Sequence, residues 1–228
     1  MKKHFVLSLS LLSLIYCKKE HKNESFLSSK VEKIGKDSLI SHNSIKYFRF
    51  QPDTISNINI DGFETSDSFS YQGNKFITGY YRPIEGEIAN PDTENDYGKR
   101  LLVMNDKNEI IFKGIGSGDT FQYQPKFYRN DSNNKVVIIC QMAFEYFFGG
   151  EAFLLENNKI KHIGNLDIES DKMEKKLTDI IKIDELKNDI IFSFKSDSLL
   201  LSPGSDDILI PNHNVRYIYS HSKLSLKR

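Results

Sequence analysis

The chain has 228 residues, of which 39% are apolar, and its 31 Lys and Arg residues balance 31 Asp and Glu residues. This length suits one domain or two small ones with a sizeable core. The balanced charge argues against binding to nucleic acid, because a duplex requires clustered cations. The sequence contains 26 Ile but only 3 Ala. Because β-branched residues favour strands and Ala favours helices, this composition predicts a mainly β fold.

The first 16 residues have the features of a secretory signal peptide. Lys2 and Lys3 precede an apolar run from Phe5 to Ile15. As a helix, this run would rise only about 16 Å, which is about half the apolar thickness of a bilayer. We therefore predict that residues 1–16 are a signal peptide and not a membrane span.

The apolar run ends in Leu14-Ile15-Tyr16-Cys17, and Lys18-Lys19-Glu20 follows. The first motif resembles the lipobox of bacterial lipoproteins, and the charged residues resemble the start of exported lipoproteins of the Bacteroidota. The resemblance implies that Cys17 is the lipid attachment site and that a lipid anchor holds the protein on a membrane. It also implies export as an outer membrane lipoprotein that faces the periplasm or the cell surface. The alternatives are an uncleaved anchor or a signal cut elsewhere.

Residues 17–44 follow as a predicted lipidated tether, since they mix Lys, Glu, Ser, Asn and His with scattered apolar residues. As a coil, such a segment spans about 25 to 30 Å. A short amphipathic helix that packs back on the domain is the alternative. Residues 45–228 are predicted to form a single β-rich domain.

Strand-like runs with a period of two recur from Ile45 onward. They lie near residues 45–50, 75–81, 100–105, 109–114, 120–128, 135–142, 151–155, 159–163, 189–195, 208–210 and 215–220. Turn residues at 105–108, 130–134 and 156–158 predict three consecutive hairpins. The sequence therefore predicts an antiparallel meander that forms a sandwich, an open barrel or propeller-like sheets.

One segment departs from the period of two. Asp171 followed by Glu174 has the pattern of a helix N-terminus. Apolar residues then follow at helical spacing, namely Met173, Leu177, Ile180 and Ile181. We predict an amphipathic helix near 171–182, with a strand over Thr178–Ile183 as the alternative.

The longest predicted loop, from Arg82 to Gly98, has 17 residues, two prolines and five acids. Loops of this length usually bind partners or are disordered. Because the loop has little apolar content to hold it to the core, its deletion is expected to leave stability nearly unchanged. Its candidate binding residues are Arg82, Glu85, Glu87, Asp92, Glu94, Asp96 and Tyr97.

The same loop has the beginning of a calcium-binding pattern, with acids at 92, 94 and 96. The Gly that such a site requires is replaced by Tyr97, and Val103 stands at the position of the bidentate acid. We therefore predict no metal site. The Gly-rich segment 114–119 matches neither a dinucleotide fingerprint nor a P-loop, which favours a flexible connection.

Two further features concern packing. Cys140 lies in an apolar strand, so it is predicted to be a buried core thiol. The run Phe144-Glu145-Tyr146-Phe147-Phe148 places four aromatics in five positions. These cannot all face one core from a single strand, so another element or a partner must cover some of them.

No motif predicts catalytic residues or a cofactor. Ser220 and Lys223 match a spacing used in helical active sites, but on a strand they would face opposite ways. The favoured function is a lipid-anchored, non-enzymatic module that binds an unknown protein or envelope component. The alternatives are an envelope hydrolase whose active site is assembled only by the fold, and an immunity-type inhibitor of a secreted toxin.

Overall fold

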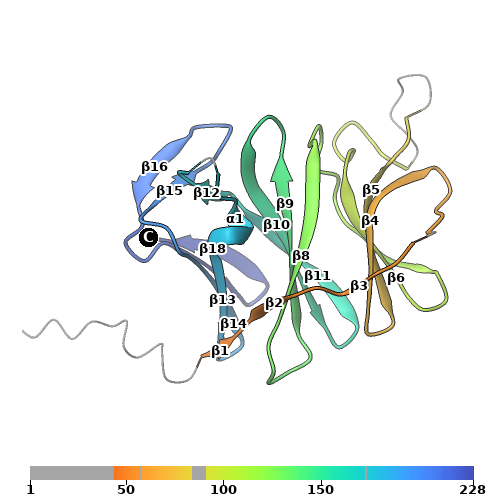
Figure 1. Ribbon diagram of the computed structural model, residues 1–228, viewed down its shortest axis with the longest axis horizontal. Helices are drawn as coiled ribbons and strands as arrows, with labels where there is room; N and C mark the ends of the chain where they lie inside the picture. The colour runs from red at the N-terminus through yellow and green to blue at the C-terminus, as the bar shows by residue number, and fades with distance from the viewer. Residues whose placement is uncertain (1–43, 57, 84–90, 173) are drawn as a thin grey trace, which may run out of the picture. The chain divides into compact units, whose positions relative to one another are not determined.

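The computed structural model describes residues 44–56, 58–83, 91–172 and 174–228. The predicted signal peptide and, apart from Ser44, the predicted tether lie outside these residues. The described strands form four antiparallel sheets with one short helix, which confirms a mainly β fold (Figure 1). Each sheet of described strands is an open row with two ends, so none of them closes into a barrel. Over the same residues, no helix has the length and apolar character to cross a membrane.

The first sheet has five strands in the order β3-β4-β5-β6-β7. They are β3 (Asp53–Thr54), β4 (Phe63–Tyr71), β5 (Asn74–Tyr81), β6 (Arg100–Met104) and β7 (Ile110–Lys113). The predicted hairpin between β6 and β7 is confirmed. Its turn forms because the Asn105 side chain accepts the N–H groups of Lys107 and Glu109 at 3.0 and 2.9 Å.

The central sheet has the order β11-β10-β9-β8-β2. Its strands are β2 (Phe48–Phe50), β8 (Gln122–Arg129), β9 (Val136–Ala143), β10 (Phe147–Glu156) and β11 (Lys159–Leu166). The hairpins predicted at 130–134 and 156–158 connect β8 to β9 and β10 to β11, as expected. Two of the three predicted hairpins therefore belong to the central sheet, and the hairpin at 105–108 belongs to the first sheet.

The third sheet has the order β1-β13-β14-β17-β18, and a small sheet has the order β12-β15-β16. The third sheet consists of β1 (Ile45–Lys46), β13 (Ile181–Leu186), β14 (Asp189–Phe194), β17 (Arg216–Ser220) and β18 (Lys223–Lys227). The small sheet consists of β12 (Ile168–Ser170), β15 (Ser198–Leu201) and β16 (Ile208–Pro211).

The middle strands of the central sheet, β9 and β10, are buried on both faces. All eight residues of β9 are buried, and alternate residues enter different cores. Val136 and Ile138 pack in one core with Phe76 of the first sheet. Val137 packs in the other core with Phe192 of the third sheet. The central sheet therefore lies between the first sheet on one side and the third and small sheets on the other (Figure 1).

The helix predicted near 171–182 is wrong in extent. The observed helix α1 covers only Leu177–Ile180, and β13 begins at Ile181. From there the chain pairs residue by residue with β14, which supplies the backbone hydrogen bonds that a longer helix would have made internally. Asp171 does not cap the helix, since its carboxylate accepts the hydroxyls of Ser196 and Ser198.

Candidate functional site

The structure divides the predicted binding loop into parts with different roles. Glu85 and Glu87 lie outside the described residues. Arg82 forms an exposed ion pair with Glu64, in which Nε lies 2.6 Å from Oε2. Glu94 is exposed. Arg82 is not brought together with the acids at the end of the loop, which contact a different cation.

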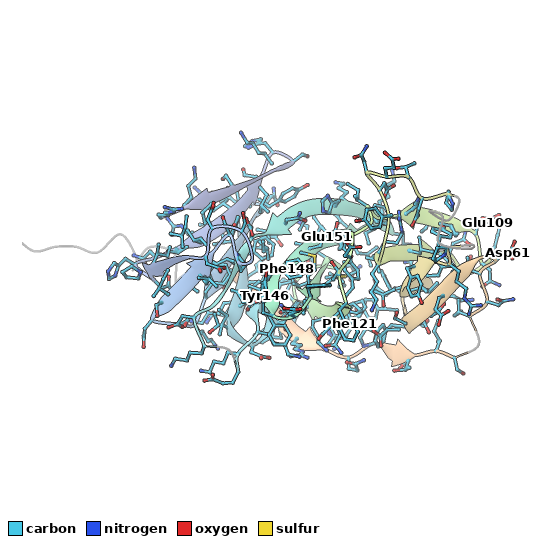
Figure 2. All side chains as sticks on the ribbon, turned by 90° about the horizontal axis from the view of Figure 1, so that it is seen from above. Asp61, Glu109, Phe121, Tyr146, Phe148 and Glu151 are labelled. Atoms are coloured by element: carbon cyan, nitrogen blue, oxygen red, sulfur yellow. The ribbon has the colours of Figure 1, made fainter. Side chains whose placement is uncertain are left out.

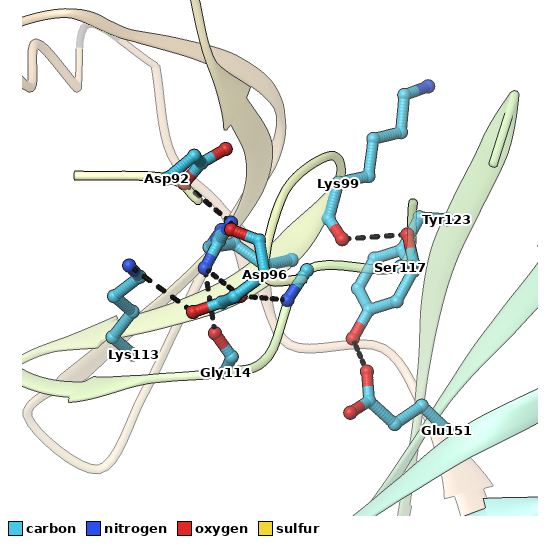
Figure 3. Close-up of polar contacts among 10 residues, drawn as sticks. Asp92, Asp96, Lys99, Lys113, Gly114, Ser117, Tyr123 and Glu151 are labelled. Atoms are coloured by element: carbon cyan, nitrogen blue, oxygen red, sulfur yellow. Dashed lines mark hydrogen bonds and ion pairs between the residues drawn. The ribbon is translucent and has the colours of Figure 1, made fainter. Parts of the chain in front are cut away.

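That cation is Arg100, which is wholly buried at the start of β6. Its Nη2 donates to the Asp92 carboxylate at 2.6 Å, and its Nη1 donates to the Asp96 carboxylate at 2.8 Å (Figure 3). Its Nη1 also donates to the Gly114 carbonyl oxygen at 3.2 Å. The Asp92 side chain is only 3% exposed, so this pair is shielded from water. Arg100 therefore ties the end of the loop to the first sheet.

This ion pair argues against the expectation that a loop with little apolar content is only weakly held to the core. That expectation considered only apolar residues within the loop, whereas the cation lies beyond it at position 100. The guanidinium also occupies the space between Asp92 and Asp96, where a calcium ion would have to sit. Within the described ranges, no cluster of three or more His, Cys, Asp or Glu side chains could hold a metal ion.

The Asp96 carboxylate is further stabilised in its charged form. Burial raises its pKa, but the Gly116 N–H and the charges of Arg100 and Lys113 outweigh burial, so the pKa of Asp96 lies below its usual value. The Lys113 ammonium lies 3.7 Å from this carboxylate. Asp92 is thus engaged inside the protein, and Asp96, whose side chain is 37% exposed, is engaged by Arg100 and Lys113.

The Gly-rich segment 114–119 packs against the end of the loop. The Gly116 N–H donates to Asp96 at 2.7 Å, and the Gly118 N–H donates to the Tyr97 carbonyl oxygen at 2.9 Å. A Cβ on Gly116 would lie 2.1 Å from that same carbonyl oxygen, so the close approach requires glycine. The amides that a phosphate would need are already used within the protein.

Three large aromatic side chains are exposed at one end of the central sheet. The exposed fractions are 76% for Phe121, 54% for Phe144 and 47% for Tyr146. Because Gln122 of β8 pairs with Ala143 of β9, the residues just beyond this pair, Phe121 and Phe144, emerge at the same end of the sheet. Figure 2 shows Phe121 and Tyr146 close to each other in projection. We call Phe121, Phe144 and Tyr146 the aromatic surface.

The aromatic run at 144–148 divides between the interior and the exterior, as predicted from its composition. Phe147 and Phe148 are half-buried, and Phe148 packs against the core between the central and first sheets. The Lys176 ammonium lies 4.8 Å from the centroid of the Phe147 ring. The pairing of β9 with β10 shifts between Phe147 and Gly150, and this irregularity separates the run from the regular part of β10.

Tyr146 lines two hollows beside the aromatic surface. The first, of about 350 Å³, is bordered by Asp119, Phe148 and Pro203. The second, of about 280 Å³, is bordered by Phe147, Glu169, Asp171, Lys172 and Lys175. The Tyr97 hydroxyl donates to Asp119 at 3.3 Å, so this loop residue lies next to the first hollow. Of the predicted loop residues, Tyr97 thus lies beside the aromatic surface, whereas Arg82 contacts Glu64.

Glu169 lies at the second hollow with its carboxylate turned inward. Its Oε2 accepts the Gln141 amide at 3.0 Å and the Gly149 N–H at 3.1 Å. Its Oε1 accepts the Ser170 N–H at 3.1 Å. Burial raises the pKa of Glu169 to about 7, although these donors favour the charged form. By contrast, the hydroxyls of nearby serines hold the pKa of Asp171 below its usual value, the Ser198 hydroxyl most of all.

A second buried polar cluster lies between the central and first sheets. The Glu151 carboxylate accepts the Tyr123 hydroxyl (Figure 3). The same carboxylate lies 2.9 Å from His162 Nε2. Cys140 pairs with Glu151 across the strands and is fully buried and free, as the sequence predicted. Burial, reinforced by the Glu151 charge, raises the pKa of the Cys140 thiol. A thiol that is neutral and shielded in this way is not a nucleophile.

Sequence reasoning missed Arg100, Phe121 and Glu169. A signal existed for Arg100, because a charged residue directly before the apolar run 101–104 needs a buried partner. No comparable signal marks Glu169, whose partners Gln141 and Gly149 come from two other strands, β9 and β10. Phe121 is exposed only because of where β8 begins.

No family model, curated protein or solved structure matches this chain. A functional assignment therefore depends on the geometry of its own residues.

Arg100→Met is expected to destabilise the protein by about 3–5 kcal/mol, because it leaves the Asp92 carboxylate buried without its partner. Arg82→Met removes the same type of residue from an exposed pair and should cost less than about 1 kcal/mol. Urea unfolding of both variants measures the difference. Similar small losses in both would show that the loop is not held through Arg100.

Glu169 should make stability depend on pH. Its pKa is raised in the folded protein, so its contribution is complete below its unfolded pKa near 4.5 and is lost as the pH rises through about 7. Between pH 5 and pH 8, the wild type should lose up to about 3 kcal/mol relative to Glu169→Gln, which cannot ionise. Unfolding free energies of both proteins across this range test the expectation, and parallel curves would contradict it.

Proposed function

We propose that this protein is a lipid-anchored envelope protein that binds a protein or another envelope component through its aromatic surface, without catalysing a reaction. The observation that carries the proposal is the exposure of Phe121, Phe144 and Tyr146 together at the end of the central sheet. Exposed groups of large apolar side chains mark interaction sites, and aromatic residues contribute most to interface energies.

The surroundings of the aromatic surface support binding. Tyr146 has a hollow on each side into which a partner's side chains could fit. Strand β9, which is buried on both faces and ends directly before Phe144, holds the surface in place, so little conformational entropy is lost on binding. Lys99 packs its ammonium 5.6 Å from the centroid of the Phe121 ring, which adds a charge at the edge of the surface.

The attachment to a membrane is proposed from the sequence at residues 1–44. Leu14-Ile15-Tyr16-Cys17 supports lipid attachment at Cys17, and the following residues supply the tether. In this proposal the protein is exported, lies on the outer membrane, and faces the periplasm or the cell surface. The aromatic surface would then be available to other components of the envelope.

An envelope hydrolase is the second candidate, because the hollow beside Tyr146 holds two carboxyl groups whose pKa values move in opposite directions. Such a pair is typical of acid–base sites. We place it second because protein donors already engage both oxygens of Glu169. A hydrolase would lose turnover of an envelope polymer in Glu169→Gln, whereas a binding module would retain its partner.

Lipid attachment predicts that a fatty-acid probe labels the wild-type protein in growing cells but not Cys17→Ser. Cys140→Ser is the matched control and should be labelled like the wild type, because Cys140 is buried in the core. Equal labelling of wild type and Cys17→Ser would refute the anchor.

Binding through the aromatic surface predicts that a photo-crosslinking amino acid in place of Phe144 forms a defined adduct in intact cells. The same amino acid in place of Ile110 is the control, because Ile110 is 45% exposed but lies on β7 of the first sheet. Adducts at both positions, or at neither, would contradict the proposed surface.

A further inference from the structure

A groove with a different chemistry lies where the chain passes from the third sheet to the central sheet. It encloses about 570 Å³ and is lined by residues of β1, β2, α1 and β13. Four cations line it, namely Lys46, Arg49, Lys182 and Lys195. We call this feature the cationic groove.

The cations of the groove outnumber its acids, although the charges of Lys46 and Lys182 act on Asp184. Within the described part of the chain, none of the four forms an ion pair. Two acids, Asp179 and Asp184, also line the groove. The Asp179 carboxylate is engaged by the backbone N–H of Lys176 at 3.1 Å. Four cations against these two acids leave the groove with an excess of positive charge.

A further lysine, Lys126, lies within the field of Arg49 and Lys176. Burial lowers the pKa of Lys126, and the charges of Arg49 and Lys176 lower it further, whereas the charges of Asp67 and Asp179 raise it. The pKa of Lys126 remains lowered, so these acids offset the repulsion between the cations only in part. A bound anion would relieve this repulsion, so the charge distribution itself favours an anionic ligand.

The inner wall and the rim of the groove suit the edge of a membrane. Tyr128 is buried at the wall, and its hydroxyl donates to the Thr178 carbonyl oxygen at 3.3 Å. Phe48 lies at the rim and is 58% exposed. An aromatic ring beside cations is the combination found where proteins contact the interface between lipid headgroups and acyl chains.

The position of the groove in the fold also suits contact with a membrane. The described chain begins at Ser44, two residues before Lys46. Arg49 pairs with Tyr128 near the end of β8, whereas Phe121 directly precedes the start of this strand. Seven residues of strand separate positions 121 and 128, which corresponds to about 23 Å. The groove and the aromatic surface therefore lie toward opposite ends of β8.

We propose that the cationic groove binds the phosphate headgroups of anionic lipids in the membrane that carries the protein. This inference depends on the proposed lipid anchor for its setting, and it adds an orientation. With its groove on the membrane, the domain would hold the aromatic surface away from the bilayer.

Vesicle flotation tests the proposal with the full chain carrying Cys17→Ser, so that no lipid anchor contributes. Binding to vesicles containing phosphatidylglycerol should exceed binding to pure phosphatidylcholine and should weaken with salt. Adding Arg49→Ser and Lys182→Ser should reduce binding to the anionic vesicles at least about tenfold. The control adds Lys107→Ser and Lys223→Ser, which remove the same charge from exposed hairpin positions outside the groove.

Three results would overturn the proposal: no preference for anionic vesicles, equal losses in the two double variants, or release of the bound protein by millimolar inorganic phosphate. The last result would identify a soluble phosphate compound as the ligand. Thermal unfolding checks that each variant is folded, and Lys195→Ser at the exposed rim replaces any variant that is not. Because Cys17 is absent from this assay, its failure is separate from failure of lipid labelling or of crosslinking at Phe144.

Discussion

The burial of the middle strands of the central sheet on both faces is the constraint on which the rest of this structure depends. All eight residues of β9 are buried, so a sheet must cover each face. The first sheet covers one face, where Phe112 packs edge-on against Phe153. The third and small sheets cover the other face, where Val137 and Phe192 share a core. Side chains in the middle of the central strands therefore serve packing, and contacts with other molecules are left to the strand ends.

Polar groups inside this arrangement must find their partners within the protein. Gln141 of β9 shows how several elements meet at one such group. Its amide donates to the Gly149 carbonyl oxygen at 2.9 Å and to Glu169, while its carbonyl oxygen accepts the Thr178 N–H at 3.1 Å. One side chain thereby connects the central sheet to the small sheet and to α1. Arg100 likewise connects the loop before β6 to the first sheet through its ion pair with Asp92.

The two ends of the central strands differ in chemistry. At the start of β8, large aromatic rings are exposed beside two hollows. Near the end of the same strand, Arg49 and Lys182 line a groove with an excess of positive charge. An exposed apolar surface favours binding of another macromolecule, whereas a surplus of cations favours binding of phosphate groups. The rigid sheet keeps these two surfaces apart, which suits a protein that is held at a membrane and binds on its other side.

The sequence by itself determined the mainly β character and the hairpins at 105–108, 130–134 and 156–158, because alternation and turn residues are local properties. It also showed that the aromatics of 144–148 could not all face one core from a single strand. Only the tertiary structure decided that the segment after Ile180 is a strand, because β14 offers it hydrogen bonds that local spacing does not reveal. The same holds for the site, where Arg100 engages Asp92 and Glu169 receives donors from Gln141 and Gly149. The cationic groove likewise brings Arg49 beside Lys182, and residues so distant in sequence meet only when the sheets pack.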